Sequence, residues 1–237
     1  MSVIGASDLL LRGGIEVEGR LVDASNATLY CTATLDDVSA VCVYKPVSGE
    51  RPLWDFPTGT LAARERATYL VSEAAGWHLV PTTVLRDGPF GPGMVQLWIE
   101  VDEQVDPVAL VRSRHPDLRR MAVLDAVVNN ADRKGGHLLP TADSRVMGID
   151  HGVTFSVDDK LRTLLWQWAG QPLDDESVAA LSQLESELTA GGLGHELSRL
   201  LTRREISVTV GRVRALLRTG LHPEPPTDWP AIPWPPF

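Results

Sequence analysis

The order of strand-like and helix-like segments constrains the fold of this chain more than any other feature of its sequence. Residues 1–103 hold β-rich runs at 15–22, 27–35 and 38–45, then a helix-favouring run that stops at Gly76, and then two strand-like runs on either side of the turn 87–93. From Pro107 onward, helical spacing and glycine stops dominate. We therefore predict an α+β fold with two lobes, a β-rich lobe over 1–103 and a mainly helical lobe over 104–222.

Two local patterns refine this division. Thr58 or Thr60 precedes the helix-favouring run of the first lobe and is a suitable N-cap. Seven prolines occur in residues 222–237, so we expect the segment 223–237 to be extended rather than helical. Its aromatic side chains, Trp229, Trp234 and Phe237, indicate that this tail packs against the rest of the protein.

The charge balance argues against several classes of partner. The 237 residues include 31 Asp and Glu against 22 Lys and Arg, a net charge of -9, which would repel phosphate backbones and anionic membrane surfaces. We therefore expect no nucleic-acid binding and no stable membrane association. The two cysteines lie in strand-like apolar runs, and neither a signal peptide nor a long apolar run is evident, so a reducing, cytoplasmic location is expected.

A lysine and a glutamate stand out in the first lobe. Lys45 follows Val41 and Val43 at strand spacing, so its ammonium shares a face with two valines and is in need of a partner. Glu65 lies on the partly buried stripe of the following helix, one turn from Leu61 and Tyr69. The two side chains are candidates for an ion pair, although Lys45 could also reach into water and Glu65 could be a solvated helix carboxylate.

The stretch 125–139 carries an apolar helix into a charged, glycine-containing loop. Asp132 lies just beyond the helix, where a carboxylate can accept a proton from a substrate hydroxyl, and Arg133 and Lys134 could neutralise transferred charge. Asp150 follows the apolar run 146–149 and is suited to binding a divalent metal. Each motif alone is common, whereas strand Lys, helix Glu, loop Asp and metal-binding Asp together have the order and residue types that phosphoryl transfer needs, which makes the set much more specific.

The motifs NADRKGGH, 130–137, and GIDHGVTF, 148–155, resemble those of the phosphatidylinositol 3/4-kinase superfamily, particularly the type II phosphatidylinositol 4-kinases, the HipA-type bacterial protein kinases and an actinobacterial group of kinase-like proteins. The resemblance implies a two-lobed protein-kinase-like fold that binds ATP with Mg²⁺ or Mn²⁺ in the cleft. It also implies a role for each matched residue: phosphate contact for Lys45, pairing with Lys45 for Glu65, catalysis for Asp132, metal binding for Asp150, and the adenine hinge for Gln96, Trp98 and Glu100.

Two positions depart from the family pattern. His137 stands where a metal-binding Asn is usual, so either Mn²⁺ is favoured as the metal, or His137 does not bind it and Asn130 or a water completes the shell. The glycine-rich phosphate loop is missing as well. Ser25, Asn26 and Thr28 could offer backbone N–H groups to phosphate in its place, or could simply form a hairpin turn.

The function we expect from these residues is a metal-dependent kinase that transfers the γ-phosphate of ATP to a hydroxyl of a protein or a small polar molecule. A lipid kinase is an alternative that the net charge disfavours. A pseudokinase that binds nucleotide or a partner without transfer is a second alternative, suggested by His137. A metal hydrolase using His137, Asp150 and His151 is the weakest, because no helical ligand spacing accompanies these residues.

Overall fold

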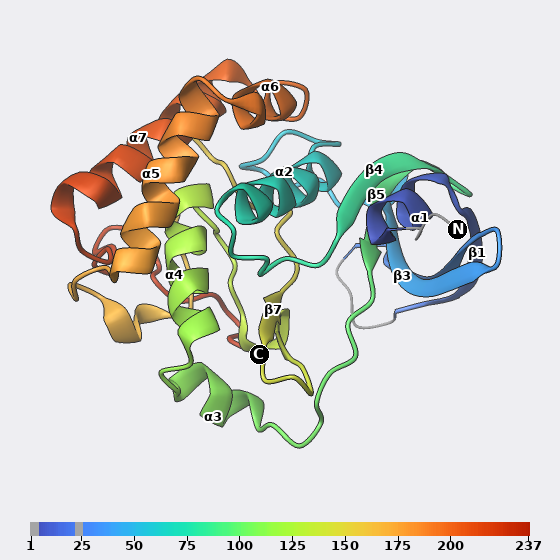
Figure 1. Cartoon of the computed structure of the whole chain (residues 1–237), viewed down its shortest axis with the longest axis horizontal. Helices are drawn as coiled ribbons and strands as arrows, with labels where there is room; N and C mark the ends of the chain where they lie inside the picture. The colour runs from blue at the N-terminus through green and yellow to red at the C-terminus, as the bar shows by residue number, and fades with distance from the viewer. Residues whose placement is uncertain (1–4, 22–25) are drawn as a thin grey trace.

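The computed structural model describes residues 5–21 and 26–237 and has two parts (Figure 1). The first part contains a five-stranded antiparallel sheet in the order β1-β2-β3-β5-β4. Its strands are β1 (Gly14–Arg20), β2 (Leu29–Leu35), β3 (Val38–Pro46), β4 (Thr83–Gly88) and β5 (Gly91–Leu97). The three strands and the later hairpin predicted from the sequence are therefore confirmed.

The two faces of this sheet have different surroundings. One face packs beneath helix α1 (Ala6–Arg12), where Leu9 and Leu10 cover Cys42 and Tyr44 in a separate small core. Alternation along β3 places Val43 and Lys45 on the opposite face. Lys45 is thus directed toward helix α2 (Leu61–Ala74) and the second part of the chain, as its strand spacing predicts.

Helix α2 begins where the sequence predicts but is capped differently. Thr60 is its N-cap residue, yet the hydroxyl of Thr60 donates to the carbonyl of Pro57 and makes no cap bond. The carboxylate of Glu50 accepts instead from the N–H groups of Leu61 and Ala62, at 3.3 and 2.9 Å. Since a carboxylate also complements the positive end of the helix dipole, the segment between β3 and α2 holds the start of the helix in place.

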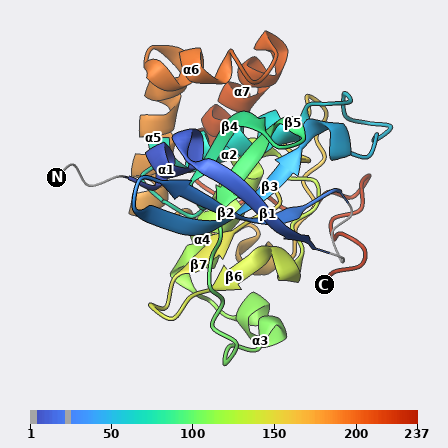
Figure 2. The ribbon, with the colours of Figure 1, turned by 90° about the vertical axis from the view of Figure 1, so that its right-hand side faces the viewer.

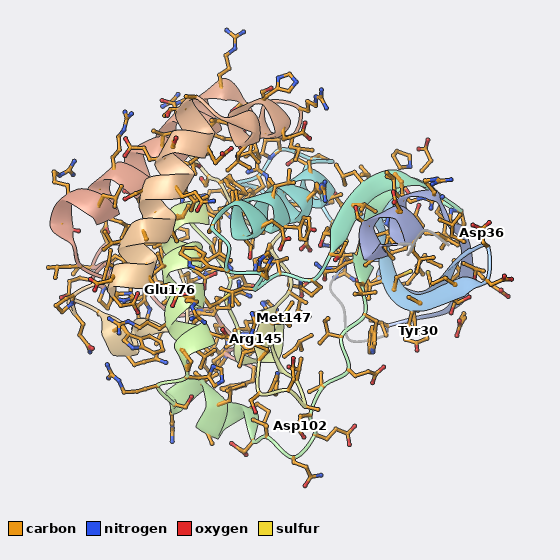
Figure 3. All side chains as sticks on the ribbon, viewed as in Figure 1. Tyr30, Asp36, Asp102, Arg145, Met147 and Glu176 are labelled. Carbon is orange, nitrogen blue, oxygen red and sulfur yellow. The ribbon has the colours of Figure 1, made fainter. Side chains whose placement is uncertain are left out.

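The second part consists mainly of helices around a large apolar core (Figures 1 and 2). Its elements are α3 (Pro107–Arg112), α4 (Pro116–Val128), the short hairpin β6 (Leu138–Pro140) and β7 (Val146–Gly148), α5 (Asp175–Thr189), α6 (Gly192–Leu197) and α7 (Arg203–Thr219). Ten of the 13 residues of α4 are buried, so this helix lies at the centre of the core. Arg145, which precedes β7, pairs with Asp117 of α4 at 2.9 Å and lies beside that helix (Figure 3).

Some elements had no counterpart in the sequence prediction. Helices α1 and α6 span only seven and six residues, too few for a periodic pattern to be distinctive, and β6 has only three residues. Strand β7, in contrast, coincides with the apolar run 146–149, whose strand end the sequence places before Asp150. The tail 223–237 contains no helix or strand, as expected from its prolines. Among the described residues, we find no helix with both the length and the apolar character needed to cross a membrane.

Candidate active site

A cleft of about 640 Å³ opens between the two parts of the chain. Most of the residues predicted from the sequence to be functional line this cleft. From the first part they are Asn26, Lys45 and Glu65, and from the second part Asp132, Lys134, His137 and Asp150. Residues up to 124 positions apart in the sequence therefore meet at one site, for which β3, α2 and the loops after α4 and β7 supply the side chains.

Lys45 is the centre of a cluster of charges in the cleft. Its Nζ donates to Oε1 of Glu65 at 2.9 Å and also to Oδ1 of Asp150. Burial by itself lowers the pKa of Lys45, but the charges of Asp150 and Glu65 outweigh it, and the pKa is raised. The other oxygen of Glu65 accepts from the backbone N–H of His151 at 2.9 Å, so Glu65 also fixes the segment that carries Asp150.

Asp150 is held in an unusual backbone conformation. Its φ of 60° lies in the left-handed region, which non-glycine residues seldom adopt and which costs on the order of 1 kcal/mol. The ammonium of Lys45 lowers the pKa of Asp150, so this carboxylate is ionised at neutral pH. Oδ2 of Asp150 lies 3.3 Å from Nε2 of His137. Strain of this kind in a cleft-lining carboxylate is typical of a functional position.

The hydrogen bonds of His137 indicate which nitrogen carries its proton. Nδ1 accepts from the backbone N–H of Lys134 at 3.4 Å, which leaves Nε2 as the protonated nitrogen facing Asp150. Burial lowers the pKa of His137, so its ring is neutral at pH 7. In this arrangement Nε2 of the imidazole faces the carboxylate of Asp150 at 3.3 Å.

The donors in the cleft suit a divalent ion that is shared with a ligand. Asp150 offers a half-exposed carboxylate to Mg²⁺ or Mn²⁺, whereas the protonated Nε2 of the neighbouring His137 has no lone pair for a metal. Asn130 is completely buried, and its amide oxygen accepts from the N–H of Asp132 while its amide nitrogen donates to Asp125. Within residues 5–21 and 26–237, no three His, Cys, Asp or Glu side chains converge closely enough to form a metal site by themselves.

Asp132 faces the cleft from a loop that is fixed at several points. Its carboxylate lies 3.3 Å from Nζ of Lys134 and 3.8 Å from Nη2 of Arg162. The loop backbone is bonded to neighbouring segments through Ala131 N to Val153 O at 3.0 Å and Arg133 N to Arg162 O at 3.0 Å. Asp132 is therefore a partly exposed carboxylate on a rigid support, with two cations close by.

Arg133 does not lie where the sequence suggested. Its guanidinium is completely buried and donates to Asp125, to the carbonyl of Ile149 at 2.9 Å and to Nε2 of His151 at 2.5 Å. It is directed into the core rather than into the cleft, because a buried carboxylate two turns upstream is its partner. Asp125 was not recognised from the sequence, although a carboxylate within an apolar helix is a signal that could have revealed it. The same burial holds His151 away from the cleft, which argues against a metal hydrolase using it.

The proposed adenine hinge begins with Gln96 in β5 and continues beyond the end of this strand, and its residues do not line the cleft. Gln96 is buried and donates to the hydroxyl of Thr83 at 2.8 Å, Trp98 packs edge-on against Tyr30, and Glu100 is exposed. In the predicted phosphate loop, Ser25 lies outside the described residues. The amide oxygen of Asn26 accepts from the N–H of Arg51 at 2.8 Å, an interaction that ties this loop to the segment after β3.

Several solved structures share this fold. The Golgi casein kinase with Mn/ADP bound is 17% identical to this chain with a TM-score of 0.61, over 90% of this chain and 74% of that one. The Helicobacter pylori proinflammatory kinase CtkA is 11% identical with a TM-score of 0.55, over 90% and 94% of the two chains. Hydra Fam20 with sugar is 13% identical with a TM-score of 0.54, over 90% and 86%. The chain has the two-lobed, α+β fold of the atypical protein kinases, as predicted.

The family of the chain follows from a much closer relative. Protein Rv2133c of Mycobacterium tuberculosis is 44% identical over 264 aligned positions, which cover 97% of this chain and 94% of that protein. The chain belongs to the same family as Rv2133c. No family model matches the sequence.

Proposed function

We propose that this protein is an ATP-dependent phosphotransferase that requires Mg²⁺ or Mn²⁺. The observation that carries the proposal is the Lys45 cluster, in which a strand lysine is held between a helix glutamate at 2.9 Å and the strained, ionised Asp150. A half-buried lysine with two carboxylate partners is costly to build for stability alone, since desolvating the charges offsets much of their attraction. It is well suited to binding the phosphates of a nucleotide.

Each residue of the cluster has a distinct role in this proposal. Lys45 would contact the nucleotide phosphates while Glu65 keeps its ammonium in position. Asp150 would bind the metal, which neutralises charge on the phosphates, and His137 would hold Asp150 in the correct orientation. Asp132 would accept the proton of the acceptor hydroxyl as the acceptor oxygen bonds to the γ-phosphorus and the bond from that phosphorus to the bridging oxygen of ADP breaks.

We further propose that the acceptor is a hydroxyl of a protein or a small polar molecule and that the protein is a member of the phosphatidylinositol 3/4-kinase-like superfamily. The motifs around Asp132 and Asp150 support the superfamily, and the net charge of -9 favours a protein or polar acceptor over an anionic lipid. The similarity to the Golgi casein kinase and to CtkA is consistent with a protein acceptor but concerns the fold alone.

Transfer of labelled phosphate tests the proposal. The protein would be incubated with γ-labelled ATP and either Mg²⁺ or Mn²⁺, and transfer to the protein itself, to added protein and to water would be followed. We expect metal-dependent transfer that Asp132→Ala abolishes without loss of nucleotide binding. Nucleotide binding without transfer in either metal would support the pseudokinase alternative, and no nucleotide binding would refute the proposal.

A further inference from the structure

The proline-rich tail occupies one end of the cleft. Pro235 and Phe237 line it together with Asp132 and Lys134. The Phe237 ring fills the space above Gly135, so that a β-carbon at Gly135 would overlap the ring. Gly135 therefore has to be a glycine for the tail to lie in this position.

The tail is attached to the segments that surround Asp132. The N–H of Gly135 donates to the carbonyl of Pro236 at 2.8 Å. Five residues earlier in the tail, the carbonyl of Ala231 accepts from the N–H of Thr163 at 3.0 Å and from Nε1 of Trp166 at 2.9 Å. These donors recognise backbone carbonyls of an extended chain, whatever side chains that chain carries.

The indole of Trp229 anchors the other end of the tail. It lies over two cations, with 5.5 Å from its ring centre to Nζ of Lys160 and 5.9 Å to the guanidinium of Arg162. Arg162 also lies near Asp132, so the tail and the proposed catalytic carboxylate share a neighbour. The tail remains partly exposed, with Trp234 between the two anchors 86% and the terminal Phe237 50% accessible to solvent.

Residues 229–237, WPAIPWPPF, contain no Ser, Thr or Tyr and therefore no side-chain hydroxyl that could accept a phosphoryl group. In the proposed reaction, an acceptor hydroxyl must approach Asp132. The tail lies close to this point, because the carbonyl of Pro236 accepts a hydrogen bond from Gly135, three residues after Asp132 in the same loop. The tail thus lies where an acceptor segment has to bind, and it cannot react.

We propose that Gly135, Thr163 and Trp166 form a groove for an extended polypeptide segment of a protein acceptor, and that residues 229–237 occupy this groove as an unreactive stand-in which the acceptor displaces. This inference rests on the proposed phosphotransfer and specifies its substrate class. The groove offers the backbone N–H groups of Gly135 and Thr163 and the indole N–H of Trp166 to carbonyls five residues apart in an extended chain. This arrangement suits a polypeptide better than a small polar molecule or a lipid headgroup.

Binding of a synthetic peptide tests the groove without any need for activity. A fluorescein-labelled peptide of sequence WPAIPWPPF would be titrated, in the absence of nucleotide, against the wild type, Phe237→Ala and Trp234→Ala, with fluorescence anisotropy as readout. Phe237→Ala should bind it at least tenfold more tightly than the wild type, because the chain's own tail then competes less. Trp234→Ala removes an exposed aromatic of the same tail and should resemble the wild type.

A second pair of variants keeps the test decisive. Adding Gly135→Ala to Phe237→Ala should abolish peptide binding, because the new methyl group fills the ring site. If Phe237→Ala lowers the unfolding temperature substantially, Trp229→Ala releases the tail from its other end and should show the same tenfold gain. Absence of peptide binding in both tail variants, or binding that Gly135→Ala leaves unchanged, would overturn the groove.

ATP binding measured on the same proteins separates the two proposals. We expect the released-tail variants to bind ATP as the wild type does, because the tail lies at the acceptor end of the cleft. ATP binding without peptide binding would refute the groove and leave the phosphotransfer proposal intact. Peptide binding without ATP binding would establish a peptide groove and refute phosphotransfer.

Discussion

Replacing Arg133 by methionine should destabilise the fold rather than act on chemistry alone. The side chains of Arg133 and Asp125 are both 0% exposed and lie 2.9 Å apart, so Arg133→Met leaves a carboxylate buried without its cation. Breaking such a pair costs about 3–5 kcal/mol, a large part of the roughly 5–15 kcal/mol that holds a domain folded. Urea denaturation followed by circular dichroism would show a correspondingly lower free energy of unfolding.

Two further variants test whether the cost of Arg133→Met arises from the buried ion pair with Asp125. Arg214→Met breaks an exposed pair with Glu185, and its cost should stay below about 1 kcal/mol. The double variant Asp125→Asn/Arg133→Met removes both charges and should be less destabilised than the sum of the two single variants. If Arg133→Met lowered the free energy of unfolding by less than about 1 kcal/mol and also abolished phosphate transfer, the structural role would be refuted. Arg133 would then be assigned a direct role in catalysis.

Two other predictions concern nucleotide affinity and pH. Lys45→Met should weaken binding of ATP and Mn²⁺ at least tenfold by isothermal titration calorimetry, since the phosphates lose their cation, and unchanged affinity would argue against a phosphate site at Lys45. Burial lowers the pKa of His222 to about 4. The unfolded chain therefore binds more protons between pH 4 and about 6.5, so stability should fall as the pH is lowered through this range. His222→Gln should flatten that dependence in urea titrations at several pH values, and an unaltered slope would mean that another group is responsible.

The sequence was sufficient to predict the position of a side chain where the periodicity of its own strand or helix determines which face it lies on. Period-two alternation along 38–45 put Lys45 on the face opposite the small core, and helical spacing put Glu65 on a buried stripe, so their pairing could be anticipated. The strands and long helices were predicted for the same reason, because their apolar patterns are long enough to be distinctive.

The sequence was insufficient to predict the position of a side chain or segment where its contacts come from residues elsewhere in the fold. Arg133 looked like part of the site because it adjoins Asp132, yet its direction is set by Asp125, Ile149 and His151. Glu50 caps α2 from a preceding loop, and no local sequence pattern predicts this contact. The position of the tail above Gly135 likewise depends on contacts across a hundred residues, and proline content predicts only that the segment is extended.

The most direct test of the central claim is the metal-dependent affinity for ATP of Asp150→Ala, compared with Asp132→Ala and with Asp143→Ala. Asp143 is an exposed carboxylate in the turn between β6 and β7 and is a matched control for loss of charge. We predict that Asp150→Ala alone greatly weakens ATP binding in Mg²⁺ or Mn²⁺, while Asp132→Ala and Asp143→Ala bind ATP as the wild type does. Equal affinity in all four proteins would contradict the assignment of Asp150 as the metal ligand and, with it, the phosphotransfer account of this cleft.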